Sequence, residues 1–100
     1  MRIYLINLAR RPDRQAAMVR AAAGLGLELD RIDALDAGGP DVPALAGRFD
    51  DAGPLGEIPR GDKCCTLSHR LAWERLLASG EPYAAVLEDD VVLSPAAGRF

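Results

Sequence analysis

The stretch Tyr83-Ala-Ala-Val-Leu-Glu-Asp-Asp-Val-Val-Leu93 decides the fold, because an apolar run leads directly into three consecutive carboxylates. An apolar run of this length, rich in strand formers and bounded by turn signals, is typical of a buried strand. We therefore predict a strand over residues 83–88. The carboxylates that follow are called the acidic group here, and they are Glu88, Asp89 and Asp90.

Two interpretations of the acidic group stay open. Neighbouring carboxylates repel one another unless a cation lies among them. In an open α/β sheet, ligands bind at the carboxyl ends of the strands. Mg²⁺ and Mn²⁺ take carboxylate oxygens together with the phosphates of a substrate. This chemistry favours a site for a metal and a diphosphate, and the alternative is a solvated acidic turn that binds nothing.

The first third of the chain predicts a strand, a helix and a second strand. Residues 2–7 are apolar and β-prone, and Pro12 suits the first turn of a helix that would run to about Ala23. Residues 27–32 alternate imperfectly and indicate a second, shorter strand. A run of this kind implies a parallel pair of strands joined by a right-handed crossover.

The middle and the end of the chain are less regular. Residues 37–61 hold six of the ten glycines and four of the seven prolines. We expect a long loop there, with a single helical turn around residues 42–46. Near the end of the chain, Ser94 followed by Pro95 predicts the start of a further helix.

A second long helix is expected over residues 62–79, where Gly80 would end it. Five residues at helical spacing share one of its faces, namely Cys65, Ser68, His69, Ala72 and Leu76. Ser68 and His69 should therefore point towards the sheet, near the acidic group. A lone histidine on such a face is more often a satisfied core residue than a ligand.

Composition and charge narrow the class of protein. The 100 residues are expected to form one soluble domain, and a net charge of −3 gives no general affinity for nucleic acid. No apolar run approaches the roughly 18 residues of a membrane-spanning helix, and no signal peptide opens the chain. The adjacent Cys64 and Cys65 make neither a loop-closing disulfide nor a CxxC metal pair. These features predict a cytoplasmic protein.

Basic residues follow the first predicted strand. Asn7 ends that strand, at the sheet edge that would also carry the acidic group, and Arg10, Arg11 and Arg14 come next. An arginine there suits a phosphate, and a solvated basic helix start is the alternative. Neither GxGxxG nor GxxxxGK[ST] occurs after the strand, so dinucleotide and P-loop sites lose their main support.

Three motifs in order resemble glycosyltransferase family 25, the lipooligosaccharide and procollagen galactosyltransferase-like family. The first is Ile3-Tyr-Leu-Ile-Asn-Leu-Ala-Arg-Arg-Pro-Asp-Arg14. The second, Gly61-Asp-Lys-Cys-Cys-Thr-Leu-Ser-His69, is similar to the family pattern Gly-x-x-Gly-Cys-x-x-Ser-His, with Cys64 in place of a glycine. The third is a tryptophan-containing helix followed by Leu-Glu-Asp-Asp. Family members run to about twice this length.

The resemblance implies an α/β fold with a Rossmann-like, mostly parallel sheet of the GT-A type and flanking helices. It implies a truncated, donor-binding half of an enzyme that transfers a sugar, expected to be galactose, from a UDP-sugar to a lipooligosaccharide or other glycan. Mn²⁺ or Mg²⁺ would be held by the acidic group, chiefly by Glu88 and Asp90 with Asp89 between them. Nucleotide-sugar contacts are implied for Asn7, Arg10, Arg14, Ser68 and His69. The catalytic base stays unassigned.

Two other classes remain as alternatives. A signalling receiver is a small α/β domain that also binds Mg²⁺ through carboxylates. It places an acidic pair after its first strand and a lysine later, whereas here Asn7 ends the first strand and no lysine follows the acidic group. A non-catalytic remnant of a glycosyltransferase is the other alternative. A truncated sheet would leave an open edge that invites pairing with a second copy, and the protein could work at the inner membrane face.

Overall fold

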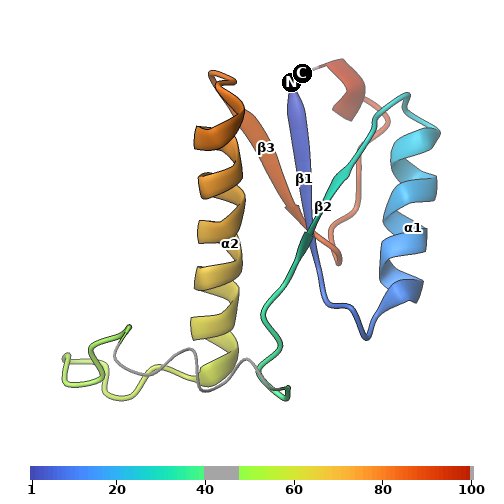
Figure 1. The fold of residues 1–100 in the computed structure, drawn as a ribbon. Helices are drawn as coiled ribbons and strands as arrows, with labels where there is room; N and C mark the ends of the chain where they lie inside the picture. Colours follow the sequence, from blue (N-terminus) through green and yellow to red (C-terminus); the bar gives the residue numbers. More distant parts are fainter. Residues whose placement is uncertain (40–47, 100) are drawn as a thin grey trace.

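Three parallel strands form the centre of the molecule, and the computed structural model describes residues 1–39 and 48–99. Strand β1 (Arg2–Asn7) lies between β2 (Asp30–Asp33) and β3 (Ala84–Glu88), and both neighbours pair with it in parallel (Figure 1). Within the described residues this is an α/β fold with an all-parallel sheet, as predicted. The carboxyl ends of the strands therefore meet at one edge of the sheet.

Two helices cover opposite faces of the sheet. Helix α1 (Pro12–Ala23) connects β1 to β2, and helix α2 (Arg60–Ser79) precedes β3 on the other side (Figure 1). Because the sheet is covered on both faces, its central strand is expected to be buried throughout. Residues 3–7 of β1 are all buried.

The core on the α2 side holds the helix against the sheet. Tyr4 and Ile6 of β1, Ile32 of β2 and Ala72 of α2 form one buried cluster. The small side chain of Ala72 lets the helix approach the sheet closely, and the larger Leu76 packs on the margin of the cluster. This packing fixes which face of α2 turns towards the carboxyl ends of the strands.

The second strand begins later than predicted, and the cap of α1 explains why. The backbone N–H of Leu27 donates to the carbonyl of Ala22, and Gly26 adopts a left-handed φ of 71°. Residues 24–27 thus complete the end of the helix. The chain pairs with β1 only from Asp30 onwards.

The remaining boundaries largely follow the sequence. Helix α2 starts at Arg60, and Gly80 ends it with a φ of 73°, as its position predicted. The described residues from 48 to 59 form turns and bends, which confirms that part of the expected loop. The helical turn expected around residues 42–46 lies outside the described residues.

The prediction of an α-helix after Ser94 is wrong within the described residues. The Ser94 hydroxyl accepts a hydrogen bond from the backbone N–H of Ala96, so the capping chemistry is present. It nucleates only a short 3-10 helix, Ala97–Arg99. In the part of the chain that the structure describes, no helix is long and apolar enough to cross a membrane.

Candidate functional site

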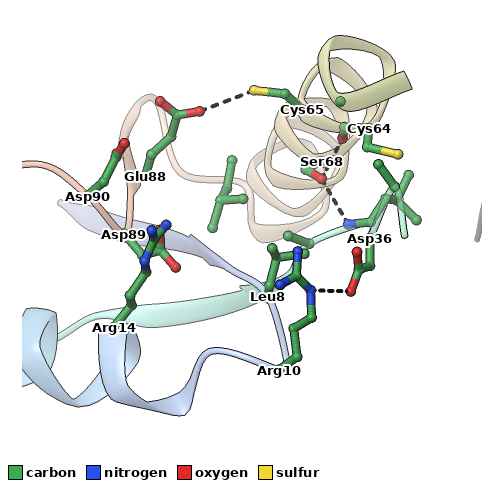
Figure 2. A pocket seen from close by; sticks show the side chains of 15 residues that line it. Leu8, Arg10, Arg14, Asp36, Cys64, Cys65, Ser68, Glu88, Asp89 and Asp90 are labelled. Carbon is green, nitrogen blue, oxygen red and sulfur yellow. Dashed lines mark hydrogen bonds and ion pairs between the residues drawn. The ribbon is translucent and has the colours of Figure 1, made fainter. Parts of the chain in front are cut away.

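A pocket of about 330 Å³ opens at the carboxyl-terminal edge of the sheet (Figure 2). The end of β1, the segment after β2, the first turns of α2 and the end of β3 all contribute to its wall. Six of the predicted site residues line it: Arg10, Arg14, Ser68, Glu88, Asp89 and Asp90. The other two, Asn7 and His69, lie behind them and contact members of the acidic group.

Asp89 points away from its two acidic neighbours and is held by the protein. The side-chain amide of Asn7 donates to its Oδ2 at 2.8 Å, and Nη1 of Arg14 lies 3.5 Å from its Oδ1. Only 12% of the Asp89 side chain is exposed. Asp89 therefore ties the end of β3 to β1 and α1, which leaves it poorly placed as a metal ligand.

Asn7 is the centre of this network. It is 1% exposed, and its amide nitrogen also donates to the carbonyl of Arg11. Its Oδ1 accepts a hydrogen bond from Nε of Arg31 at 3.0 Å. Both ends of its side-chain amide are thus engaged by protein groups, and a direct contact of Asn7 with a nucleotide stays a prediction.

Glu88 and Asp90 present their carboxylates on the opposite side of the chain from Arg14 (Figure 2). Both residues are exposed at the pocket, and they flank the tethered Asp89. Two accessible carboxylates beside space for a ligand match what a hard divalent cation takes from a protein when substrate phosphates supply the rest. Glu88 and Asp90 are therefore the residues that would hold the implied metal, and their role as ligands stays a prediction.

Cys65 lies against Glu88 instead of in the core. Its thiol donates to Oε1 of Glu88 at 3.1 Å. This hydrogen bond, together with partial burial and the charge of Glu88, raises the pKa of the Cys65 thiol to about 11. The thiol is therefore protonated at neutral pH when nothing else is bound.

The prediction that Cys65 shares the buried face of α2 is wrong. The buried positions are Cys64, Ser68 and Ala72, which are spaced four residues apart. Cys65 and His69 lie one position further round the helix, about 100° away. Cys65 therefore lines the pocket, and His69 lies against Glu88 beside it. The expectation that His69 lies near the acidic group is confirmed, because its Nε2 is 3.6 Å from Oε1 of Glu88.

Ser68 faces the sheet side, as predicted, but its hydroxyl is used within the protein. It is 1% exposed, donates to the carbonyl of Cys64 at 2.6 Å and accepts from the backbone N–H of Leu35 at 3.0 Å. Ser68 thus attaches the segment after β2 to helix α2. Its contribution to nucleotide-sugar binding stays a prediction.

The positive side of the pocket comes from the start of α1. Arg10 forms an ion pair with Asp36 at 2.8 Å, and Arg14 reaches towards Asp89. The backbone N–H of Gly38 and the guanidinium of Arg10 hold the pKa of Asp36 below its usual range. Asp36 is a pocket residue that the sequence did not indicate, because nothing local marks where the segment after β2 will pack.

Comparison with known proteins identifies the family. The family model described as "Glycosyltransferase family 25 (LPS biosynthesis protein)" matches residues 1–99. The chain belongs to glycosyltransferase family 25. The resemblance seen in the three motifs is thereby confirmed, and the receiver interpretation is set aside.

The relatives of this family 25 chain are much longer than it is. A lacto-N-neotetraose biosynthesis glycosyltransferase, LgtB, of Neisseria gonorrhoeae is 31% identical over 100 residues, which are all of this chain and 36% of the relative. A glycosyltransferase 25 family member of Anopheles gambiae is 34% identical over 93% of this chain and 17% of its own length. The chain spans about a third of the length of the bacterial relatives it matches. The expectation that family members are about twice as long as this chain is therefore too small.

One relative found in the same comparison is named as inactive. A mouse protein named inactive glycosyltransferase 25 family member 3 is 31% identical over 89% of this chain and 16% of its own length. The family 25 chain therefore shares this region with proteins named as glycosyltransferases and with one named as inactive.

Proposed function

We propose that this family 25 chain is the donor-binding half of a glycosyltransferase. The reaction would transfer a sugar, expected to be galactose, from a UDP-sugar to a lipooligosaccharide or other glycan. The observation that carries the proposal is the pocket at the strand ends, where arginines on one side face accessible carboxylates on the other. A nucleotide diphosphate with its metal carries both charges that such a pocket complements.

The metal would be Mn²⁺ or Mg²⁺, held by Glu88 and Asp90. When bound, such an ion acts as a Lewis acid that stabilises the charge developing on the leaving diphosphate. Asp89 has a different part, because its hydrogen bond from Asn7 holds the turn that presents its two neighbours. The family's acidic motif thus divides into two ligands and one anchor.

The diphosphate would lie towards Arg10 and Arg14. The 3.5 Å separation between Arg14 and Asp89 is long for an ion pair, and the Arg14 side chain is 42% exposed. Arg14 can therefore turn towards a phosphate at little cost, with the bidentate geometry that guanidinium groups offer. The pocket volume falls within the usual range for small-molecule sites.

The proposal also includes where the protein acts and how it would pair with a second copy. The protein would act in the cytoplasm, where its UDP-sugar donor would be found. It would work at the inner face of the membrane, where it would reach a lipid-linked acceptor. Strand β3 pairs only with β1 among the described residues. Its free edge is the surface on which a second copy would pair.

Thermal unfolding with added ligand tests the metal assignment. Mn²⁺ should raise Tm, and more so with UDP present, because a ligand that binds only the folded state stabilises it. At a concentration tenfold above Kd the gain is about 1.4 kcal/mol, which is a shift of several degrees for a domain of this size. Asp90→Asn should remove most of the response to Mn²⁺ and leave the fold intact.

Glu81→Gln is the matched control for this experiment. Glu81 is an exposed carboxylate that precedes β3, at the end of the strand opposite the acidic group. Its substitution should leave the Mn²⁺ response unchanged. An equal shift in Asp90→Asn and in the unsubstituted protein would show that the ion binds elsewhere.

A further inference from the structure

Three chemically different ligand groups converge beside the pocket. The thiol of Cys65, the imidazole of His69 and the carboxylate of Glu88 each offer one atom, and these atoms all lie within 4.8 Å of one another. Sγ of Cys65 is 3.1 Å from Oε1 of Glu88, and Nε2 of His69 is 3.6 Å from the same oxygen. The proposed Mn²⁺ site makes no use of the thiol or the imidazole.

Regular elements hold the three groups in place. Cys65 and His69 are four residues apart on α2, so they lie one above the other on a single helix face. Glu88 is the last residue of β3, 23 positions away from Cys65 in the sequence. A site built on a helix and a strand keeps its geometry better than one built on loops.

Two of the three separations are close to those of a tetrahedral zinc centre, and the third, between the thiol and the imidazole, is within 4.8 Å. Bond lengths of about 2.3 Å to sulfur and about 2.1 Å to nitrogen and oxygen place the ligand atoms of such a centre roughly 3.4–3.6 Å apart. The observed 3.1 and 3.6 Å differ from the corresponding values by about 0.5 Å or less. A small rotation of the Cys65 or Glu88 side chain would remove this difference. A thiolate and a carboxylate together balance the charge of a divalent ion.

The chemistry of the ligands selects the ion. Thiolate and imidazole ligands favour Zn²⁺, whereas Mn²⁺ and Mg²⁺ favour oxygen. We propose that Cys65, His69 and Glu88 bind Zn²⁺, with the fourth position open to water or to another ligand. The zinc site does not depend on the glycosyltransferase proposal. Glu88 is the one ligand that it shares with the proposed Mn²⁺ site. Zn²⁺ should consequently compete with Mn²⁺ for Glu88.

Titration with Co²⁺, a spectroscopic substitute for Zn²⁺, tests the site in the purified chain. Co²⁺ should produce a sulfur-to-metal charge-transfer band and the visible absorption of a tetrahedral centre, and added Zn²⁺ should abolish both. Cys65→Ser should remove the charge-transfer band. His69→Ala should weaken Co²⁺ binding by more than about tenfold, because even loss of an outer partner of a metal ligand costs that much.

Two control variants separate the possible outcomes. Cys64→Ser removes the neighbouring thiol, which is buried on the core face of α2, and should keep the band. Asp90→Asn should keep the band while losing the Mn²⁺ response, so the two metal proposals fail separately. Co²⁺ binding without a sulfur band, or a band that survives in Cys65→Ser, would overturn the zinc site.

A measurement on the unsubstituted chain covers the case in which a cysteine variant does not fold. At a Zn²⁺ concentration tenfold above Kd, the reaction of Cys65 with a maleimide should be about tenfold slower, because only about one thiol in eleven is then free of the ion. Peptide mass analysis identifies the modified cysteine. An unchanged modification rate at saturating Zn²⁺ would contradict coordination by Cys65.

Discussion

Three adjacent acidic residues have different surroundings, and this decides what each can do. Asp89 accepts a hydrogen bond from Asn7 and is almost buried, whereas Glu88 and Asp90 are exposed at the pocket. Asp89 and Asp90 lie in the turn that follows β3, and the hydrogen bond from Asn7 holds Asp89 there. The middle carboxylate is therefore available for anchoring and the outer two for binding.

Asn7→Ala tests the anchor at this scale. The substitution leaves Asp89 and the guanidinium of Arg31 without the hydrogen bonds that Asn7 makes to them. An unpaired buried polar group costs about 1–3 kcal/mol, and urea unfolding should show a loss of stability of that size.

The control for Asn7→Ala is Asp33→Asn. Asp33 ends the neighbouring strand β2, and its side chain is 72% exposed although it pairs with Arg31. Exposed substitutions of this kind usually change stability by less than about 0.5 kcal/mol. An Asn7→Ala protein as stable as the control would mean that the Asn7 network contributes nothing to the fold.

At the scale of elements, features that depend on a few neighbouring residues were predicted well. Features that depend on packing between elements were not. The apolar run before Asn7 and the glycine at position 80 mark β1 and the end of α2 without help from the rest of the chain. The start of β2 depended on how the cap of α1 closes through Leu27. Such a hydrogen bond between helix and following chain leaves no clear mark in the sequence.

The phase of α2 shows the same limit. Two adjacent cysteines allow either to continue the stripe through Ala72, and periodicity alone cannot choose between them. Packing against Tyr4 and Ile6 makes the choice, buries Cys64 and turns Cys65 to the pocket. The same rotation creates the juxtaposition with Glu88, so the zinc site could not be predicted from spacing.

Ser68→Ala tests how α2 is joined to the segment after β2. It leaves the backbone N–H of Leu35 without its hydrogen bond, in a partly buried position. The expected loss is about 1–3 kcal/mol of unfolding free energy, measured by urea denaturation. Ser79→Ala, an exposed serine of the same helix, is the control and should lose less than about 0.5 kcal/mol. Equal losses in both would show that the hydrogen bonds of Ser68 contribute no more to stability than those of the exposed Ser79.

The whole molecule gathers polar groups from three separate parts of the chain at one edge. Those groups line the pocket, and the single histidine lies against Glu88. Sugar transfer also needs an aligned acceptor hydroxyl and a base, and a positioned base alone contributes about 10²–10⁴-fold. The bacterial relatives devote about two thirds of their length to sequence that this chain does not match.

We therefore expect these 100 residues on their own to bind UDP with Mn²⁺ weakly and to transfer no sugar. Incubation with UDP-galactose, Mn²⁺ and a panel of oligosaccharide acceptors measures this, with Asp90→Asn as the background. Metal-dependent product above that background would show that the acceptor site and the base are already present.

The central claim is that the strand-end pocket binds a nucleotide diphosphate through a metal on Glu88 and Asp90. Calorimetric titration of UDP into the chain, with Mn²⁺ and then with a chelator, tests it most directly. We predict that Mn²⁺ tightens UDP binding about tenfold or more, which is about 1.4 kcal/mol, and that Asp90→Asn loses this gain while Glu81→Gln keeps it. UDP affinity that is the same with and without Mn²⁺, or a gain that Asp90→Asn retains, would contradict the account.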